Sequence, residues 1–256
     1  MNQGRLKDRV ALITGGARGI GKAAARKMAQ EGASVVLLDI LPKEAAQTAE
    51  ELKAMGGKAL GIKADVTCKE EVVKAVEQTL THFGRVDILV NNAGIVKPAL
   101  LEDVLDGDWE EVVNVNLKGA FFCTRAVLPA MKKQRYGKII SISSRASLGK
   151  ELRTVYGATK AALIGVTRTW ALELAPYNIN VNCIGPGPIA TELFKRNNPA
   201  DSPKTKAIID AIPLKRMGQP EDVANLISFL ASDESSFITG QAIFICGGIT
   251  VGLVHY

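Results

Sequence analysis

The sequence predicts a single α/β domain in which a doubly wound, seven-stranded parallel sheet is flanked by helices on both faces. Short apolar, β-rich runs alternate with helical runs along the whole chain. Polar or glycine-rich stretches directly follow the apolar runs. Strands of a parallel sheet need such crossover helices between them, and the helices cover both faces of the sheet.

The elements follow in order from these patterns. The first run, VALIT at residues 10–14, is short and rich in β-formers, and the KAAARKMAQEG that follows its glycine turn is rich in helix formers. Residues 69–83 place Val72, Val73, Val76, Leu80 and Phe83 on one stripe of a helix. The predicted strands are residues 10–14, 34–38, 58–63, 86–90, 137–142, 179–184 and 241–246. The predicted helices are residues 22–32, 42–55, 69–83, 108–133 and 154–175, and two short helical stretches follow a polar segment at 191–205.

The turn after the first strand indicates a dinucleotide site of the Rossmann type. Its glycines, Gly15, Gly19 and Gly21, have the spacing GxxxGxG and enclose Arg18 and Ile20. Strand, glycine turn and helix in this order place backbone N–H groups and a helix N-terminus where a pyrophosphate can bind. Any tight turn between a strand and a helix favours glycine, so the turn alone is a weak signal.

Asp39 favours NAD over NADP as the cofactor. It ends the second strand 18 residues after Gly21, about where such sites place an acid on the adenosine ribose. A carboxylate there accepts hydrogen bonds from the ribose hydroxyls and repels the 2′-phosphate of NADP. Arg18 argues in the opposite direction, because a basic residue in the turn would attract that phosphate. We expect NAD, with NADP less favoured; a helix N-cap is the alternative role for Asp39.

Further polar or Gly/Pro stretches end the later strands. Since ligands of open parallel sheets bind at the carboxyl ends of the strands, these stretches are expected to converge on one site. They are Asp65-Val66, Asn91-Asn92-Ala93-Gly94, Ser143-Ser144 and Gly185-Pro186-Gly187-Pro188-Ile189.

Tyr156 and Lys160 form the candidate acid/base pair. Four residues apart near the start of a helix, they lie on one face, so the ammonium sits beside the phenol. The ordinary pKa of tyrosine is about 10, and lowering it by one requires a preference of about 1.4 kcal/mol for the phenolate. A neighbouring cation favours the phenolate, and a nicotinamide ring with its positive charge would add to this effect. Tyr156 is therefore expected to exchange a proton with an alcohol oxygen near neutral pH.

Composition excludes several other classes. The net charge of +6 is spread without basic stripes or aromatic interleaving, so we expect no nucleic-acid partner. The four cysteines, Cys68, Cys123, Cys183 and Cys246, form no CxxC pair and are expected to be reduced.

His82 and His255 have no ligand cluster around them in the sequence, so no metal site is expected. Without an apolar stretch of membrane length or a signal-peptide pattern, we expect a cytoplasmic protein with no membrane association.

With these motifs in this order, the chain resembles the short-chain dehydrogenase/reductase family over nearly its whole length, and most closely its 3-oxoacyl carrier-protein reductase-like members. The matching motifs are TGGARGIG at residues 14–21, Asp65-Val66, NNAG at 91–94, Val115-Asn116, Ile142-Ser143-Ser144, Tyr156 with Lys160, and PGPIAT at 186–191. The resemblance implies one domain over residues 1–256, with a dinucleotide-binding part at about 1–140 and a catalytic and substrate part at about 141–256.

The resemblance also implies the roles of individual residues. Tyr156 would be the catalytic acid/base, Lys160 would lower its pKa and bind the nicotinamide ribose, and Asn116 would hold a water linked to Lys160. Asp65 and Val66 would contact adenine, Asn92 the adenosine-side ribose, Ile189 the carboxamide and Thr191 the pyrophosphate. The full set of expected cofactor residues is Gly15, Arg18, Gly19, Ile20, Gly21, Asp39, Asp65, Val66, Asn92, Gly94, Tyr156, Lys160, Pro186, Gly187, Ile189 and Thr191.

The catalytic serine is left open between two residues. The family usually places it 13 residues before the tyrosine, which gives Ser143, but also second in an Ile-Ser-Ser run, which gives Ser144. We favour Ser144, because a strand end is harder to shift than a loop length. The family's cofactor contacts and this serine would together give an NAD(P)-dependent oxidoreductase acting on CH–OH groups.

The expected partners are a small ketone or secondary alcohol and further copies of this chain. The resemblance implies a homotetramer or homodimer, with Phe121, Phe122, Val166 and Trp170 as candidates for contacts across a two-fold axis; core packing explains these residues equally well. Two other functions stay open: a catalytically silent dinucleotide-binding regulator, and an isomerase or dehydratase that uses bound NAD.

Overall fold

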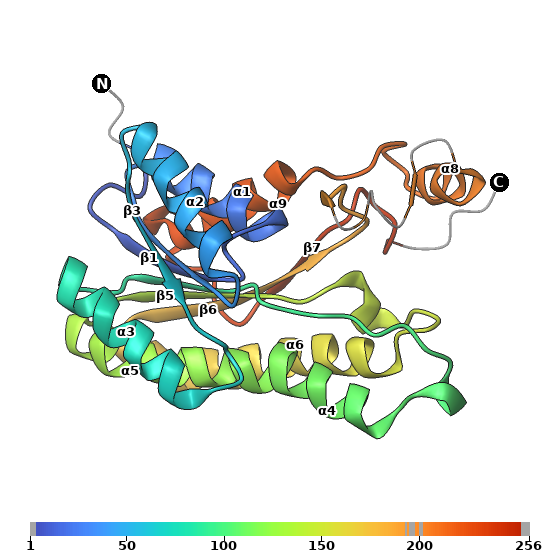
Figure 1. Cartoon of the computed structure of the whole chain (residues 1–256), viewed down its shortest axis with the longest axis horizontal. Coiled ribbons are helices and arrows are strands. Elements are labelled where there is room, and N and C mark those ends of the chain that lie inside the picture. The colour runs from blue at the N-terminus through green and yellow to red at the C-terminus, as the bar shows by residue number, and fades with distance from the viewer. Residues whose placement is uncertain (1–3, 193, 195–197, 200–201, 252–256) are drawn as a thin grey trace.

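The computed structural model describes residues 4–192, 194, 198–199 and 202–251, and within these residues seven strands form one sheet with every neighbouring pair parallel (Figure 1). The strand order is β3-β2-β1-β4-β5-β6-β7. The predicted fold class is therefore confirmed. The strands are β1 Val10–Thr14, β2 Ser34–Asp39, β3 Lys58–Lys63, β4 Ile88–Asn91, β5 Gly137–Ile142, β6 Ile179–Pro186 and β7 Ala242–Ile245.

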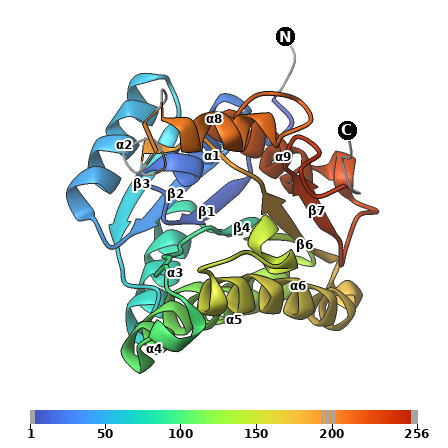
Figure 2. The same cartoon turned by 90° about the vertical axis from the view of Figure 1, so that its right-hand side faces the viewer.

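Helices cover both faces of the sheet (Figures 1 and 2). One face carries α1 (Gly19–Gln30), α2 (Pro42–Ala54) and α9 (Pro220–Ala231), and the other carries α3 (Lys69–Phe83), α4 (Asp106–Val113), α5 (Gly119–Gln134) and α6 (Thr154–Leu174). Helix α8 (Pro203–Asp210) lies at the outer end of the molecule, beyond β7. The short helices are η1 Leu101–Asp103, η3 Arg145–Leu148, η4 Ala175–Tyr177 and η5 Asp233–Ser235, with a π-helical segment η2 at Asn114–Lys118.

The core consists of a cluster on each side of the sheet, because side chains alternate between the two faces of a strand. In β1, Ala11 and Ile13 join the cluster beneath α1 and α9, whereas Leu12 joins the cluster beneath α3 and α5. All five β1 residues are buried. A strand with both faces covered is therefore apolar throughout, as the VALIT run predicted.

The strand order places a crevice at the carboxyl edge of the sheet. Strand β1 pairs with β2 on one side and with β4 on the other, so the connections after β1 and β4 leave to opposite faces. Loops after neighbouring strands separate at such a point and leave room for a ligand.

The expected helix at residues 108–133 differs from prediction in its middle. The helical path has no break, but the π-helical segment η2 lies between α4 and α5, and in it the N–H of Gly119 donates to the C=O of Asn114. Strand β6 also runs on to Pro186, two residues beyond the prediction. Val73 is exposed, while Val72 and Val76 of the same predicted stripe are buried. Among the described residues, no helix combines the length and apolar character that a membrane span requires.

Candidate functional site

The glycine turn after β1 is shaped to receive a ligand. Gly15 and Gly19 have φ values of +60° and +54°, a conformation that favours glycine. A Cβ on Gly21 would lie 2.1 Å from the carbonyl oxygen of Gly15, so the turn and α1 approach too closely for any side chain. Arg18 is the N-cap residue of α1 but supplies no side-chain cap, and the first turn holds no acid. The N-terminus of α1 therefore fits an anionic group such as a pyrophosphate.

Asn92 fixes this turn to the end of β4. Its Nδ2 donates to the carbonyl oxygens of Thr14 (3.0 Å) and Gly15 (2.9 Å). The hydroxyl of Thr14 in turn accepts from the N–H groups of Asn92 and Ala93, both at 3.0 Å. The two loops that border the crevice are thus held as one unit. Sequence patterns did not indicate this role of Thr14, which stands inside the apolar run of β1.

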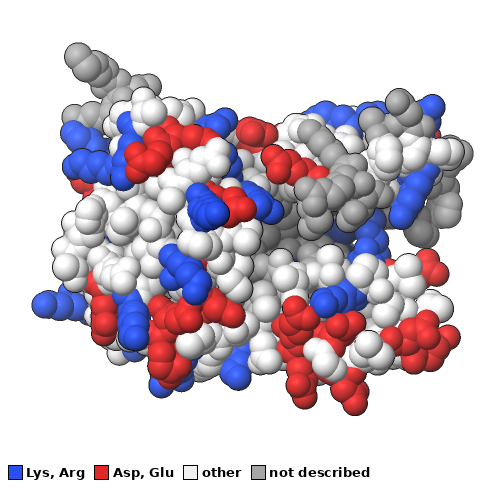
Figure 3. Space-filling model, viewed as in Figure 1, with Lys and Arg blue, Asp and Glu red and all other residues white. Residues whose placement is uncertain are grey.

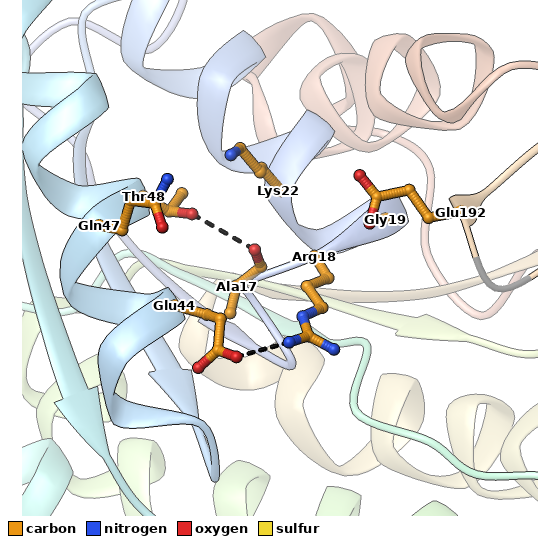
Figure 4. A pocket seen from close by; sticks show the side chains of 8 residues that line it. All are labelled: Ala17, Arg18, Gly19, Lys22, Glu44, Gln47, Thr48 and Glu192. Atoms are coloured by element: carbon orange, nitrogen blue, oxygen red, sulfur yellow. Dashed lines mark hydrogen bonds and ion pairs between the residues drawn. The ribbon is translucent and has the colours of Figure 1, made fainter.

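Asp39 also supports the turn from the end of β2. One of its carboxylate oxygens accepts from the N–H of Ala17 (3.0 Å) and the other from the N–H of Leu41 (3.1 Å), and the residue is 9% exposed. Both oxygens are therefore already bound to backbone. Arg18 lies at the exposed rim instead, where its guanidinium pairs with Glu44 at 2.5 Å (Figure 4).

Two adjoining pockets open beside the start of α1. The first has a volume of about 150 Å³ and the second about 240 Å³, and both are lined by Gly19, Lys22 and Glu192. Thr191 lines the second, and its Cγ2 lies 3.5 Å from the position of a Cβ on Gly19. The structure therefore brings Thr191 to the glycine turn, although the two are far apart in sequence. The first pocket is completed by Ala17, Arg18, Glu44, Gln47 and Thr48 (Figure 4).

Asp65 and Val66 lie after β3 and have local structural partners. The Asp65 carboxylate accepts from the N–H and the hydroxyl of Thr67, both at 2.8 Å, and so orders the turn into α3. Val66 is 8% exposed and packs on Gly119, where a Cβ would lie 2.8 Å from its Cγ2.

Pro186, Gly187 and Ile189 carry the chain over the end of β7. The N–H of Gly187 donates to Ile245 (2.9 Å), and a Cβ on Gly187 would lie 2.7 Å from the Cα of Cys246. Ile189 is buried and bridges to Gly218. This backbone path explains the small residue at position 187.

Lys160 and Asn116 meet at Gly94. A Cβ on Gly94 would lie 3.3 Å from both Lys160 Nζ and Asn116 Oδ1. Asn116 lies in η2 and holds Ile95 by two hydrogen bonds, accepting from its N–H (2.8 Å) and donating to its C=O (3.0 Å). It also donates to Thr159, a contact that no sequence pattern indicated. The π turn at this point matches the frequent occurrence of such turns at functional sites.

The two serines after β5 have different partners. Ser143 is buried, and its hydroxyl donates to the C=O of Lys160 at 2.6 Å. Ser144 is half-buried, its hydroxyl accepts from the N–H of Ala146, and it lies near enough to Tyr156 to act toward a lower pKa of the phenol. Of the two serines, Ser144 is therefore the one beside the phenol.

The electrostatics of Tyr156 differ from the expectation. Burial raises the pKa of Tyr156, and the hydrogen bond with Ser144 and the charge of Arg153 act against this rise. The Nζ of Lys160 is 5.5 Å from the centre of the tyrosine ring. Burial lowers the pKa of Lys160 itself to about 8, while its Nζ donates to the C=O of Ile142 at 2.8 Å. In this state the lysine does not lower the pKa of the phenol below its ordinary value.

The sequence assigned the histidines and cysteines no role in the site, although Cys183 lies close enough to Lys160 for the two groups to affect each other's pKa. His82 is at the end of α3 with its ring edge-on to Phe83, and His255 is outside the described residues. Cys123, Cys183 and Cys246 are buried and Cys68 is half-buried. No group of three His, Cys, Asp or Glu side chains placed to hold a metal occurs in the part of the chain that the structure describes.

Known proteins are similar to this chain over almost its full length. The family model described as enoyl-(acyl carrier protein) reductase matches residues 15–250. A 3-oxoacyl-[acyl-carrier-protein] reductase of Thermotoga maritima is 45% identical over 248 residues, which are 96% of this chain and 100% of that protein. A (2S)-[(R)-hydroxy(phenyl)methyl]succinyl-CoA dehydrogenase subunit of Thauera aromatica is 42% identical over 243 residues, 95% of this chain and 97% of that protein.

Solved structures agree. A putative gluconate dehydrogenase from Agrobacterium tumefaciens superposes with a TM-score of 0.92 at 35% identity, covering 97% of this chain and 98% of that one. Levodione reductase superposes with the same TM-score at 32% identity, covering 97% and 100%.

The expected preference for NAD over NADP is wrong, because it conflicts with the 3-oxoacyl-[acyl-carrier-protein] reductases among these relatives, which are NADPH-dependent. The physical reason lies at Asp39. Its position at a strand end was correct, but both of its oxygens hold backbone N–H groups, and the rim of the pocket presents the guanidinium of Arg18.

Fold, relatives and the order of the motifs lead to one conclusion: the chain belongs to the short-chain dehydrogenase/reductase family and is a 3-oxoacyl carrier-protein reductase-like oxidoreductase acting on ketones and secondary alcohols.

Proposed function

We propose that this enzyme transfers hydride between NAD(P)(H) and the carbonyl carbon of its substrate, and that Ser144, Tyr156, Lys160 and Asn116 form the catalytic site. The observation that carries the proposal is the placement of Ser144 beside the phenol of Tyr156, where it acts on the pKa of that phenol, with the Lys160 Nζ 5.5 Å from the centre of the tyrosine ring. Two hydroxyls from different elements then face one substrate oxygen.

The cofactor supplies the hydride and, once oxidised, a positive charge beside the phenol. The glycine turn and the N-terminus of α1 would bind its pyrophosphate, with Thr191 alongside. Arg18 lies where the adenosine end would leave the turn. Asp65, Val66, Asn92 and Ile189 border the same edge of the sheet, and we assign them cofactor contacts on that placement. We also assign Ile20, Pro186 and Gly187 cofactor contacts, because they belong to the matching family motifs.

In the reductive direction, Ser144 and Tyr156 would donate hydrogen bonds to the carbonyl oxygen and stabilise the negative charge that develops on it. As hydride reaches the carbon, the C=O π bond breaks and Tyr156 gives its proton to the oxygen, which yields the alcohol. Lys160, protonated at neutral pH with a pKa of about 8, would stabilise the resulting phenolate. Asn116 fixes the backbone beside Lys160 and would hold the water through which the proton is replaced.

The raised pKa of Tyr156 makes the phenol, and hence the proton donor, the resting form. This state suits ketone reduction. Alcohol oxidation needs the phenolate, so it requires the charges of Lys160 and of the oxidised cofactor.

The test is a spectrophotometric assay of the purified protein over a panel of ketones and secondary alcohols with NADPH and with NADH. 3-Oxoacyl thioesters come first, since 3-oxoacyl-[acyl-carrier-protein] reductases are among the relatives. Turnover that disappears in Tyr156→Phe supports the proposal. Cofactor binding without turnover on any compound would favour a silent regulator, and conversion of substrate without net change of the cofactor would favour an isomerase or dehydratase.

We also propose that the active form is a homotetramer or homodimer. Leu172 on α6 and Phe237 after η5 are 80% and 102% exposed, and we take them as further candidates for contacts with a second copy. Of the residues expected at an interface, Phe121 is exposed at 41%, while Phe122 and Trp170 pack against the core. Val166 likewise packs inside, against a small cluster around Leu163. Sedimentation analysis measures the state directly.

A further inference from the structure

Four cations border the approach to Tyr156. Arg145, Lys150 and Arg153 belong to the connector of residues 145–153, which joins β5 to α6, and Lys204 belongs to the first turn of α8. The positive charges of Arg145, Arg153 and Lys204 contribute to lowering the pKa of Lys150, although burial contributes most. Lys150 is therefore close enough to each of the other three cations to be repelled by it.

In the described part of the chain, none of these four cations has a carboxylate partner, unlike several other basic residues. Arg5, Arg9, Lys22, Arg85, Lys97 and Arg216 each pair with a carboxylate. Within residues 4–192, 194, 198–199 and 202–251, no ion pair joins any of the four to an acid, and this includes Glu151 of the same connector. Like charges without partners destabilise a folded chain unless an anion joins them.

The connector holds its cations at the reacting groups. It starts just after Ser144 and ends at Arg153, three residues before Tyr156. The charge of Arg153 acts against the rise in pKa that burial causes at Tyr156. Gly149 and Leu152 have φ values of +103° and +60°. A non-glycine residue rarely adopts that conformation, so surrounding contacts fix the backbone here. One of these contacts is the bridge between Ala99 and Arg153.

The opposite border of the same opening comes from α8. Figures 1 and 2 both place α8 across from the connector, on the other side of the carboxyl edge of the sheet. Figure 3 shows Lys and Arg side chains around the hollow beneath α8, and Asp and Glu side chains gathered below it. A ligand that enters from this side passes between cations of both borders.

We propose that the substrate of this enzyme carries a negatively charged group, a carboxylate or a phosphate ester, which Lys150 and Arg153 bind from the connector and Lys204 binds from α8 while the carbonyl lies at Tyr156. The inference rests on the proposed function, because it takes Tyr156 as the reacting end. Arg145 adds positive potential at the base of the connector.

An anionic group on a small substrate fits better than an acidic carrier protein. The surface next to the connector, reached through Ala99, carries Glu102, Asp103, Asp106, Asp108, Glu110 and Glu111. Of these carboxylates, those of Asp108 and Glu111 pair with Lys97. A large acidic partner docked over the cations would also meet these carboxylates, whereas a small anion between the borders would not.

The experiment compares matched pairs of ketones: levulinate with methyl levulinate, acetoacetate with methyl acetoacetate, and dihydroxyacetone phosphate with dihydroxyacetone. For the favoured anion, kcat/KM should exceed that of its neutral counterpart at least about tenfold, since a hydrogen bond to a charged group contributes that much or more. The pair that shows the preference distinguishes a carboxylate from a phosphate. Arg153 stays unchanged in every variant, because its charge also acts on Tyr156.

The variant Lys150→Gln/Lys204→Gln should reduce the ratio of kcat/KM between the anion and its neutral counterpart about tenfold or more. The matched control is Lys53→Gln/Lys58→Gln, which removes the same charge from α2 and the far end of β3 and should keep the ratio. Equal turnover of anionic and neutral ketones that depends on Tyr156 would overturn this inference and leave the proposed function standing. Preference for a carrier-protein thioester of an uncharged ketone, reduced by the same variant, would assign the cations to protein docking and also overturn it.

If no compound of the panel is reduced, the proposed function loses its support, and calorimetry with glutarate and with inorganic phosphate then decides the inference separately. Binding of either anion that is lost in Lys150→Gln/Lys204→Gln but kept in the control supports it. No binding by the unmodified protein overturns it.

Discussion

The neighbouring serines after β5 should respond to alanine in opposite ways. Ser143→Ala removes a buried hydrogen bond of 2.6 Å to the C=O of Lys160 and leaves that carbonyl without its side-chain donor. The cost is expected at about 2 kcal/mol of unfolding free energy, which lowers the Tm by roughly 4–8 °C in a chain of this size. Its kcat should stay within about tenfold of the unmodified enzyme, because the hydroxyl does not face Tyr156.

Ser144→Ala removes the hydroxyl that Tyr156 contacts and the acceptor for the N–H of Ala146. Loss of such a cap costs about 1 kcal/mol. Loss of a hydrogen bond to the developing oxyanion lowers kcat about 100-fold or more. The stability of Ser144→Ala should therefore exceed that of Ser143→Ala, while its activity is far lower.

Both quantities come from one set of proteins: urea unfolding followed by circular dichroism, and steady-state rates with the best ketone at saturating cofactor. Ser144→Ala and Ser143→Ala serve as controls for each other, since each removes one hydroxyl one residue apart. The reasoning is refuted if Ser143→Ala is inactive at unchanged stability while Ser144→Ala keeps full activity.

The same geometry supports three further predictions. Gly94→Ala should lower kcat about tenfold with little change in Tm, because the added Cβ would lie 3.3 Å from Lys160 Nζ and Asn116 Oδ1, both held by other hydrogen bonds. The control is Gly165→Ala in α6, where an added Cβ meets no atom within 4 Å and full activity should remain. Equal rates for the two variants would contradict the crowding argument. In the cofactor-free protein, the pKa of Lys160 is about 8, below the ordinary 10.5, so between these pH values the unfolded chain binds a proton that the folded chain does not. The free energy of unfolding should therefore rise with pH across this range, by about 3 kcal/mol relative to Lys160→Met in urea titrations. A constant difference between the two proteins would show that the lysine is not desolvated. Arg18→Ala should weaken NADPH binding about tenfold in calorimetry and NADH binding much less, since only NADPH carries a 2′-phosphate on its adenosine ribose for the guanidinium to bind. An equal loss for both cofactors would show that Arg18 does not recognise the 2′-phosphate.

The sequence predicted the fold well because the fold depends on local patterns. Strands buried on both faces are continuously apolar, and the helices between them carry their own stripe or composition. The same patterns place the strand ends to within two residues, so the convergence of Gly15, Asp39, Asn92 and Ser144 at one edge follows from the parallel topology.

Contacts between these strand ends were beyond the sequence. The two oxygens of Asp39 bind N–H groups of Ala17 and Leu41, and which backbone groups face a carboxylate is decided by tertiary packing. The π turn of η2 is similar: its residues, NVNLK, have no distinctive composition, and the turn arises where Asn116 holds the backbone of Ile95. The prediction of NAD over NADP was inferred from the position of Asp39 in the sequence, and it was wrong because that position does not tell which groups the carboxylate contacts.

Strand register and loop counting point to different serines, and the register favours Ser144 for the proposed site. The N–H of Ser143 donates to Ile184 at 2.7 Å, one residue beyond the paired Ile142, so Ser143 continues the ladder between β5 and β6. Side chains alternate along a ladder, and this fixes Ser143 toward α6 and leaves Ser144 as the first hydroxyl free of it. After Ser144, Leu152 adopts a φ of +60° at a cost of roughly 1 kcal/mol or more. The same strained segment carries Lys150 and Arg153, so its backbone conformation sets where these two cations lie.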